Sequence, residues 1–184
     1  MGVRKQVAKL LAKLPKSDRR RADQAAALCW RVSDHKLEVL LITSKDTGRW
    51  IIPKGNIARR ETSYRAAQRE AFEESGMSGK IRKTAIGHYR YLKDGETLLV
   101  VAVHLLKANV EANTFPEQGE RCRVWVAPSA AAAMVDEPEL KEMLTKIDCR
   151  TVLASQDRPS KQARKSRDIH LELGTPIAEG LLPV

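Results

Sequence analysis

The chain has few cysteines and no long apolar stretch, and both shortages limit what it can be. Its cysteines, Cys29, Cys122 and Cys149, are widely spaced and form no Cys-x-x-Cys pair. An odd number at this spacing argues against a disulfide framework or a cysteine-bound zinc ion, and favours a reducing compartment. No apolar run approaches the roughly 20 residues that span a bilayer, and no apolar block with a cleavage site marks the start. We therefore expect a cytoplasmic protein without an integral membrane helix.

The basic charge is concentrated at one end of the chain. Of 184 residues, 42% are hydrophobic and 30% charged, which favours a packed domain over disorder, and the net charge is +10. Residues 1–21 hold eight Lys or Arg against one acid, a net charge of +7. We divide the chain into this basic segment (1–21), a central domain (22–153) and a polar C-terminal tail (154–184). A basic chain attracts polyanions: nucleic acid, an anionic membrane or a highly phosphorylated small molecule.

Apolar periodicity and turn residues predict a mixed α+β domain. In the basic segment, the spacing over residues 3–14 predicts an amphipathic helix that docks on its own domain. In the central domain we expect a loop over 55–61, strands over 24–33, 36–44, 49–52 and 121–126, a hairpin over 83–107, and helices from Thr62 or Ser63 to Ser75, over 129–134 and over 140–147. Strands and helices do not alternate strictly. This order favours an α/β/α sandwich in which a mixed sheet is packed between helices.

Three carboxylates crowd one face of the first predicted helix of the domain. At 100° per residue, Glu70, Glu73 and Glu74 fall within an arc of about 100°. Such neighbours repel one another, so we expect Arg69 and a hard cation, Mg²⁺ or Mn²⁺, to offset their charge. The plain alternative is a solvated acidic face. The other side of the helix is expected to pack on the sheet through Tyr64, Ala67, Ala71 and Phe72.

The carboxylates belong to a longer pattern, Gly-x5-Glu-x7-Arg-Glu-U-x-Glu-Glu-x-Gly-U, where U is an apolar residue. Its seven fixed positions are held here by Gly55, Glu61, Arg69, Glu70, Glu73, Glu74 and Gly76. Seven such matches arise by chance on the order of once in 10⁸ windows. The pattern resembles the signature of the Nudix hydrolase family. Ala71 is smaller than the usual residue at its U position, a departure that concerns packing.

The resemblance extends from about residue 18 to residue 150. Residues 18–31, 38–41 and 49–53 look like the opening of the diphosphoinositol polyphosphate phosphohydrolases, in which basic residues before the first strand help bind phosphates. Pro53-Lys54-Gly55-Asn56 departs from that subfamily, which has a glycine run there. A Pro-Lys-Gly start is also common among diadenosine polyphosphate hydrolases.

The resemblance implies a metal-dependent hydrolysis of a phosphoanhydride. It implies that Glu70, Glu73, Glu74 and the backbone carbonyl of Lys54 bind the metal, and that Arg69 and Glu61 form a structural ion pair. The base that activates water is Glu70 or a carboxylate on a late loop. For that loop we place Glu120 before Glu117, because Glu120 abuts the expected strand at residue 121 and is held more firmly.

The substrate is expected to be a small molecule with many phosphates, either a diphosphoinositol polyphosphate or a diadenosine polyphosphate. Candidate phosphate contacts are Arg19, Arg20, Arg21, Arg49 and Lys54. The alternatives are a nucleoside triphosphate, the 5′-triphosphate end of an RNA, or a binding module without catalysis. An intact acidic signature argues against the binding module, which has no need for repelling carboxylates.

Overall fold

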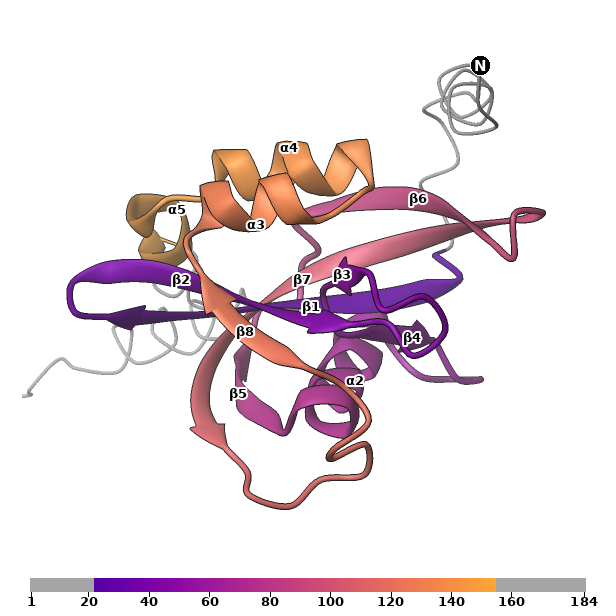
Figure 1. Ribbon diagram of the computed structural model, residues 1–184, viewed down its shortest axis with the longest axis horizontal. Helices are drawn as coiled ribbons and strands as arrows, with labels where there is room; N and C mark the ends of the chain where they lie inside the picture. The colour runs from indigo at the N-terminus through magenta and orange to yellow at the C-terminus, as the bar shows by residue number, and fades with distance from the viewer. Residues whose placement is uncertain (1–21, 155–184) are drawn as a thin grey trace, which may run out of the picture.

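The computed structural model describes residues 22–154, which form one mixed sheet with helices on both faces (Figure 1). In chain order the elements are β1 (Gln24–Ser33), β2 (Lys36–Thr43), β3 (Trp50–Ile51), β4 (Lys54–Asn56), α2 (Ser63–Ser75), β5 (Met77–Ile81), β6 (Gly87–Lys93), β7 (Thr97–Glu111), β8 (Arg123–Val126), α3 (Pro128–Met134), α4 (Pro138–Lys146) and α5 (Cys149–Ala154). Among these residues, no helix is both long and apolar enough to cross a membrane.

Strand β1 lies in the middle of the sheet. It pairs in parallel with β7, from Gln24 beside Val101 to Trp30 beside Lys107. Its other edge pairs antiparallel with β4 near its start and with β2 near its end. β3 and β8 extend the sheet beyond β2, and β5 and β6 extend it beyond β7. The expected mixed sheet and α+β class are confirmed.

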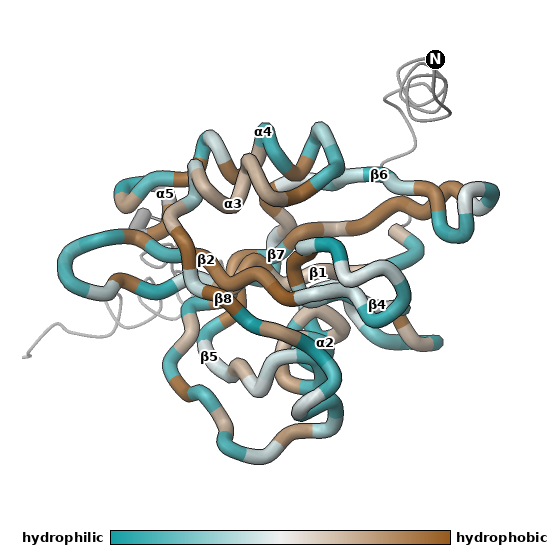
Figure 2. Tube along the Cα trace, viewed as in Figure 1, coloured by the Kyte–Doolittle hydropathy of each residue, from teal (hydrophilic) through white to brown (hydrophobic). Residues whose placement is uncertain are grey.

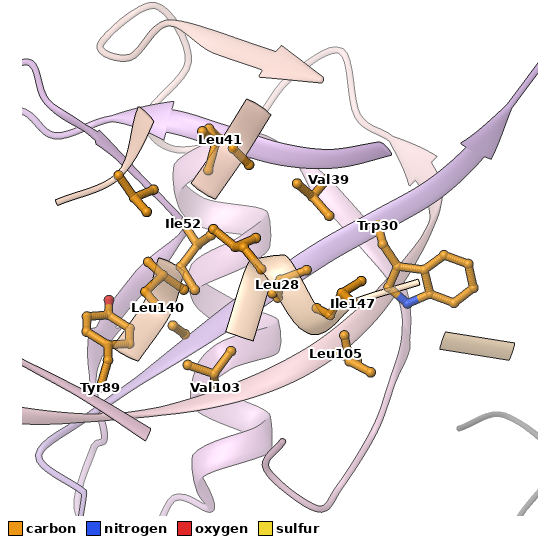
Figure 3. Packing of buried hydrophobic residues seen from close by; sticks show 14 of the residues in the cluster. Leu28, Trp30, Val39, Leu41, Ile52, Tyr89, Val103, Leu105, Leu140 and Ile147 are labelled. Atoms are coloured by element: carbon orange, nitrogen blue, oxygen red, sulfur yellow. The ribbon is translucent and has the colours of Figure 1, made fainter. Parts of the chain in front are cut away.

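The two faces of the sheet are covered by different helices: α2 on one side, α3 and α4 on the other (Figure 1). Successive side chains of β1 point to opposite faces, so both faces take apolar residues from this strand. The α3/α4 face holds the larger cluster, with Leu28, Trp30, Val103, Leu105 and Leu140 among its buried members (Figure 3). Apolar residues follow the central strands, while the outer loops are polar (Figure 2).

Helix α2 has the bounds that the sequence predicts. Thr62 stands before it in an extended conformation. Gly76 ends it with φ +72°, and its N–H donates to the Phe72 carbonyl at 2.8 Å. Glycine is needed at this position because a Cβ would lie 2.7 Å from Cδ1 of Phe115 and because φ is positive.

Several sequence expectations need correction. The expected loop over 55–61 begins inside β4, the expected hairpin runs from Gly87 to Glu111, and the strand expected from residue 121 begins at Arg123. β5 and α5 were not predicted. Phe72, expected to be buried, has 37% of its surface exposed. The expected helix over 3–14 and the tail beyond residue 154 lie outside the described residues.

Candidate active site

The buried stripe of α2 includes two of the signature carboxylates. Ala66, Ala67 and Ala71 face the sheet, and at the same helical spacing so do Glu70 and Glu74, with 9% and 5% of their surfaces exposed. These glutamates therefore do not lie on a solvated acidic face. The third carboxylate, Glu73, has 36% of its side chain exposed. The alternation of alanine and glutamate at positions 66, 67, 70, 71 and 74 is a sequence signal for this stripe.

Glu74 is held by donors from two other segments. Its Oε2 accepts the backbone N–H of Lys54 at 2.9 Å, and its Oε1 forms an ion pair with Nη2 of Arg121. Burial raises the pKa of Glu74 to about 7, although the Lys54 N–H and the Arg121 charge act in the opposite direction. The two donors fix the carboxylate against the start of β4.

Glu70 lies against the backbone of Gly55. A Cβ at residue 55 would fall 2.1 Å from the Glu70 carboxyl carbon, so only glycine leaves room for this carboxylate. Its Oε1 accepts from Nη1 of Arg69 at 2.7 Å. Burial raises the pKa of Glu70, and Arg69 opposes that shift. The glycine of the signature thus has a direct steric role in placing a glutamate of the signature.

Arg69 ties the preceding loop to the helix. Its Nε and Nη2 each lie 3.2 Å from a Glu61 oxygen, and Nη2 also donates to the Asn56 carbonyl at 2.9 Å. Its Nη1 donates to Glu73 Oε2 at 2.8 Å as well as to Glu70. The ion pair with Glu61 that the resemblance implies is present, and the same guanidinium neutralises part of the carboxylate charge.

Arg121 is a site residue that the sequence reasoning missed. Its side chain is 8% exposed and donates in three directions: to Glu74, to Glu117 Oε2 at 2.7 Å and to the Thr43 carbonyl at 2.9 Å. An arginine is suited to this because its guanidinium carries five N–H donors in a fixed plane. The only sequence signal was an arginine at the start of the strand predicted over 121–126, which by itself does not name a partner.

The two late-loop carboxylates differ in how firmly they are held. Glu117 accepts from Arg121 and from Lys45 Nζ at 2.8 Å, and its backbone N–H donates to the Glu73 carbonyl at 3.0 Å. Burial would raise the pKa of Glu117, but Lys45 and Arg121 outweigh burial and lower it. Glu120 reaches Lys45 at 2.5 Å and has half of its side chain exposed. The reason for placing Glu120 first was wrong, because β8 begins at Arg123.

A second group of polar residues lies beside β4 and β6. Arg49 and Lys54 both stand over the ring of Tyr91, at 5.7 and 4.8 Å from its centroid. Nη1 of Arg49 also pairs with Oε1 of the buried Glu137 at 2.5 Å. We call Arg49, Lys54, Tyr91 and Glu137 the Tyr91 cluster. Burial lowers the pKa of the Lys54 ammonium, with Glu74 and Glu137 acting against that shift.

The predicted site residues are therefore only partly brought together. Glu74 accepts from the Lys54 N–H, and Glu70 lies against Gly55 and shares Arg69 with Glu73. Arg121 connects Glu74 to Glu117. Glu120 lies further out, at Lys45. Arg19, Arg20 and Arg21 lie outside the described residues.

A metal ion could be held by the signature carboxylates. Oxygen donors of this kind suit Mg²⁺ or Mn²⁺. Within residues 22–154, however, no three acidic, histidine or cysteine side chains are grouped to hold a metal as they stand. Arg69 donates a hydrogen bond to one oxygen of Glu70 and one of Glu73. Both oxygens of Glu74 already have partners, the Lys54 N–H and Arg121. The donor chemistry fits, and convergence on one cation requires these arginine contacts to rearrange.

Comparison with known proteins assigns the fold and the family. A NUDIX domain model matches residues 22–147. The chain is 31% identical over 121 residues to "Nudix hydrolase 16, mitochondrial" of Arabidopsis thaliana, covering 62% of this chain and 67% of that protein. It is 40% identical over 72 residues to "Diphosphoinositol polyphosphate phosphohydrolase 3-beta" of Bos taurus, covering 39% of this chain and 43% of that protein.

A solved structure agrees with the family assignment at the level of the fold. The crystal structure of C. elegans Ap4A hydrolase superposes with a TM-score of 0.57 at 23% identity, over 68% of this chain and 94% of that one. The chain spans about half the length of other curated Arabidopsis thaliana relatives that it matches. Since the domain model matches more than half of the chain and the signature is intact, the chain belongs to the Nudix hydrolase family, as its resemblance indicated.

Proposed function

We propose that the protein is a Mg²⁺-dependent hydrolase that cleaves a phosphoanhydride bond in a highly phosphorylated small molecule. The observation that carries the proposal is the burial of Glu70 and Glu74 against the backbone of Lys54 and Gly55. Burying two carboxylates side by side is unfavourable unless a cation or strong donors compensate. A purely structural role would be served as well by apolar residues at these two positions.

In this proposal Glu70, Glu73, Glu74 and the Lys54 carbonyl hold the cation, with Mn²⁺ as a possible substitute. The cation would neutralise charge that develops on the phosphate oxygens and acidify the attacking water. Arg69 ties the Glu61 loop to the helix that carries the glutamates, and Gly55 leaves the space that Glu70 needs.

For the base outside the signature we place Glu117 ahead of Glu120. A base must be ionised and firmly placed to take a proton from water. Glu117 meets both demands, since its pKa is lowered and three contacts hold it, to Lys45, Arg121 and Glu73. Glu70 stays as the alternative within the signature.

The proposed substrates are a diphosphoinositol polyphosphate or a diadenosine polyphosphate. The Bos taurus relative carries the first of these in its name, and the Tyr91 cluster supplies two cations for phosphate, Arg49 and Lys54. Arg19, Arg20 and Arg21 are proposed as further phosphate contacts. A nucleoside triphosphate or an RNA 5′-triphosphate is the alternative, and the proposed location is the cytoplasm.

The test is a substrate panel assayed with Mg²⁺ and again with excess EDTA. The panel holds diphosphoinositol pentakisphosphate, diadenosine tetraphosphate, ATP and a short RNA with a 5′-triphosphate, with products identified by mass spectrometry. We expect EDTA-sensitive turnover, faster for the first two. Binding of all four without any product would instead support a binding module, and preference for ATP or RNA would support the alternative.

A further inference from the structure

The outer part of the β6–β7 hairpin is a ribbon of two strands that the rest of the sheet does not support. The pairing of β7 with β1 ends at Val101, and from Thr97 to Val100 the only described strand beside β7 is β6. This part, residues 91–100, projects beyond the helices, and we call it the hairpin end (Figure 1). A two-stranded ribbon is marginally stable in water unless another element packs on it.

The hairpin end is apolar where a solvated ribbon would be polar. Leu92 stands opposite Leu98, and Val100 lies on the same face because alternate residues of a strand share a face. These three residues and Leu99 are half-buried and belong to neither core cluster, whereas Val101 is fully buried in the larger one. Apolar residues continue along both strands almost to the polar turn (Figure 2). Leu92, Leu98 and Val100 thus form an aliphatic patch that no described helix covers.

The chain enters the domain beside this patch. Asp23 donates its N–H to the Val100 carbonyl at 2.9 Å, and its Oδ2 accepts the Val100 N–H at 2.9 Å. Residues 15–22 can extend by about 3.5 Å each at most, so residues 3–14 are tethered within about 30 Å of Asp23. A segment tethered at this distance has a high effective concentration at the patch, which favours it over a second copy of the chain.

The tethered segment carries an apolar stripe of matching chemistry. At 100° per residue, five aliphatic side chains fall within an arc of about 100°: Val3, Val7, Leu10, Leu11 and Leu14. Lys5 and Lys9 fall on the opposite side. A helix of 12 residues is marginal in water by itself, as the ribbon is, so each gains stability by packing on the other.

We propose that residues 3–14 form a helix whose apolar stripe packs on Leu92, Leu98 and Val100. The helix supplies the layer that the hairpin end lacks. The contact also bears on the Tyr91 cluster, because Tyr91 stands opposite Leu99 in the same ribbon and its ring lies beneath two cationic side chains. Docking of the helix stiffens the strand that carries this ring. The inference does not depend on the proposed hydrolase activity.

Two double substitutions in the full chain test the contact without changing any described core residue. Val7→Asn with Leu11→Asn removes the middle of the stripe, and Lys5→Asn with Lys9→Asn, on the opposite side, is the matched control. Amide hydrogen exchange is followed by mass spectrometry in peptides that cover residues 91–100. We expect the first pair to speed exchange there about tenfold or more, because the ribbon opens more often without its cover, and the control pair to leave it unchanged.

Two outcomes of the exchange experiment would overturn the proposal. The first is equal exchange in the wild type and in the variant without the stripe. The second is equal acceleration by both pairs of substitutions, which would indicate an effect of the segment's charge or helix content instead of an apolar contact. Thermal melting confirms that the domain is folded in each variant.

Photo-cross-linking identifies what the segment contacts. The photoreactive residue p-benzoylphenylalanine replaces Leu10, and linked peptides are identified by mass spectrometry at two protein concentrations. We expect links within one chain to residues 91–100 at both concentrations. Links between chains that increase with concentration would assign the patch to a second copy and overturn the proposal. The absence of links within the chain, in a protein that co-sediments with phosphatidylserine vesicles, would assign the stripe to a membrane surface and overturn it as well.

Discussion

The two faces of the central sheet are packed with side chains of different size. Toward α2, strand β1 and the helix itself contribute mainly alanines: Ala25, Ala27, Ala66, Ala67 and Ala71. Toward α3 and α4, β1 and its neighbouring strands contribute Leu28, Trp30, Leu41, Val103 and Leu105. Small side chains let a helix come close to a sheet, and here the Glu74 carboxylate reaches a strand N–H at 2.9 Å. The α3/α4 face thus supplies most of the apolar burial, and the α2 face positions the carboxylates.

The largest effect should come from creating a cavity on the α3/α4 face. Leu28 is fully buried there, so Leu28→Ala should lower the free energy of unfolding by about 2–5 kcal/mol. Because α2 packs on the other face, kcat per folded molecule should stay within about twofold. Urea denaturation and a rate assay at low temperature measure the two quantities. A large fall in kcat with unchanged stability would show that the faces are not separate in this way.

Glu74→Gln, on the α2 face, should affect the rate far more than Leu28→Ala does. It should leave the protein folded with a lowered melting temperature, because the amide no longer balances the buried Arg121 guanidinium, which keeps its ion pair with Glu117. The rate at saturating Mg²⁺ should fall at least about a hundredfold, since positioned ions contribute several kcal/mol to the transition state. Glu111→Gln, at an exposed carboxylate paired with Arg123, is the control. Near-normal turnover in Glu74→Gln would remove Glu74 from the proposed ligand set.

Arg121→Lys tests whether one side chain connects the α2 face to the loop that carries Glu117. A lysine cannot donate to Glu74, Glu117 and the Thr43 carbonyl in the same planar arrangement. We expect about a tenfold loss in kcat and weaker Mn²⁺ binding, measured by electron paramagnetic resonance. Arg123→Lys, two residues further along the chain, should change neither. Equal effects of the two substitutions would indicate general destabilisation.

The smallest effect concerns pH and a buried histidine on β7. His104 Nδ1 lies 3.0 Å from the Arg82 carbonyl and Nε2 lies 3.0 Å from Ser63 Oγ. Burial lowers the pKa of His104 below 6.5, so the unfolded chain takes up a proton first as the pH falls. His104 should therefore reduce stability progressively below about pH 6.5 and have no such effect above it. Melting temperatures across pH 5–8 should fall less steeply in His104→Gln than in the wild type, provided the variant is folded at pH 8.

The sequence alone predicted the elements that short stretches of residues specify by themselves. The periodicity over 24–33 and the signature from Gly55 to Gly76 gave β1, α2 and the set of carboxylates. β5 was missed because it begins directly after Gly76, and its Ser78 and Gly79 have little strand character. Its strand conformation is stabilised by pairing with β7, which is distant in the sequence.

Partners in the site were harder to predict than the site residues themselves. Arg121 meets Glu74 across 47 positions and Arg49 meets Glu137 across 88. No local spacing relates such pairs, because only the folded sheet brings them together. Burial of Glu70 and Glu74 was missed for another reason: carboxylates are rarely buried, so the stripe was placed on the more apolar side of the helix.

The parallel pairing of β1 with β7 also sets an order of events during synthesis. Gln24 pairs beside Val101, so β1 can pair with β2 early but gains its parallel partner β7 only after about half of the chain has been made. Pairing over such a separation requires closing a long loop, which slows folding. We expect a nascent chain that ends before β7 to expose the apolar faces of β1 and β2. A fragment truncated at residue 95 should accordingly bind chaperones and remain without a cooperative melting transition.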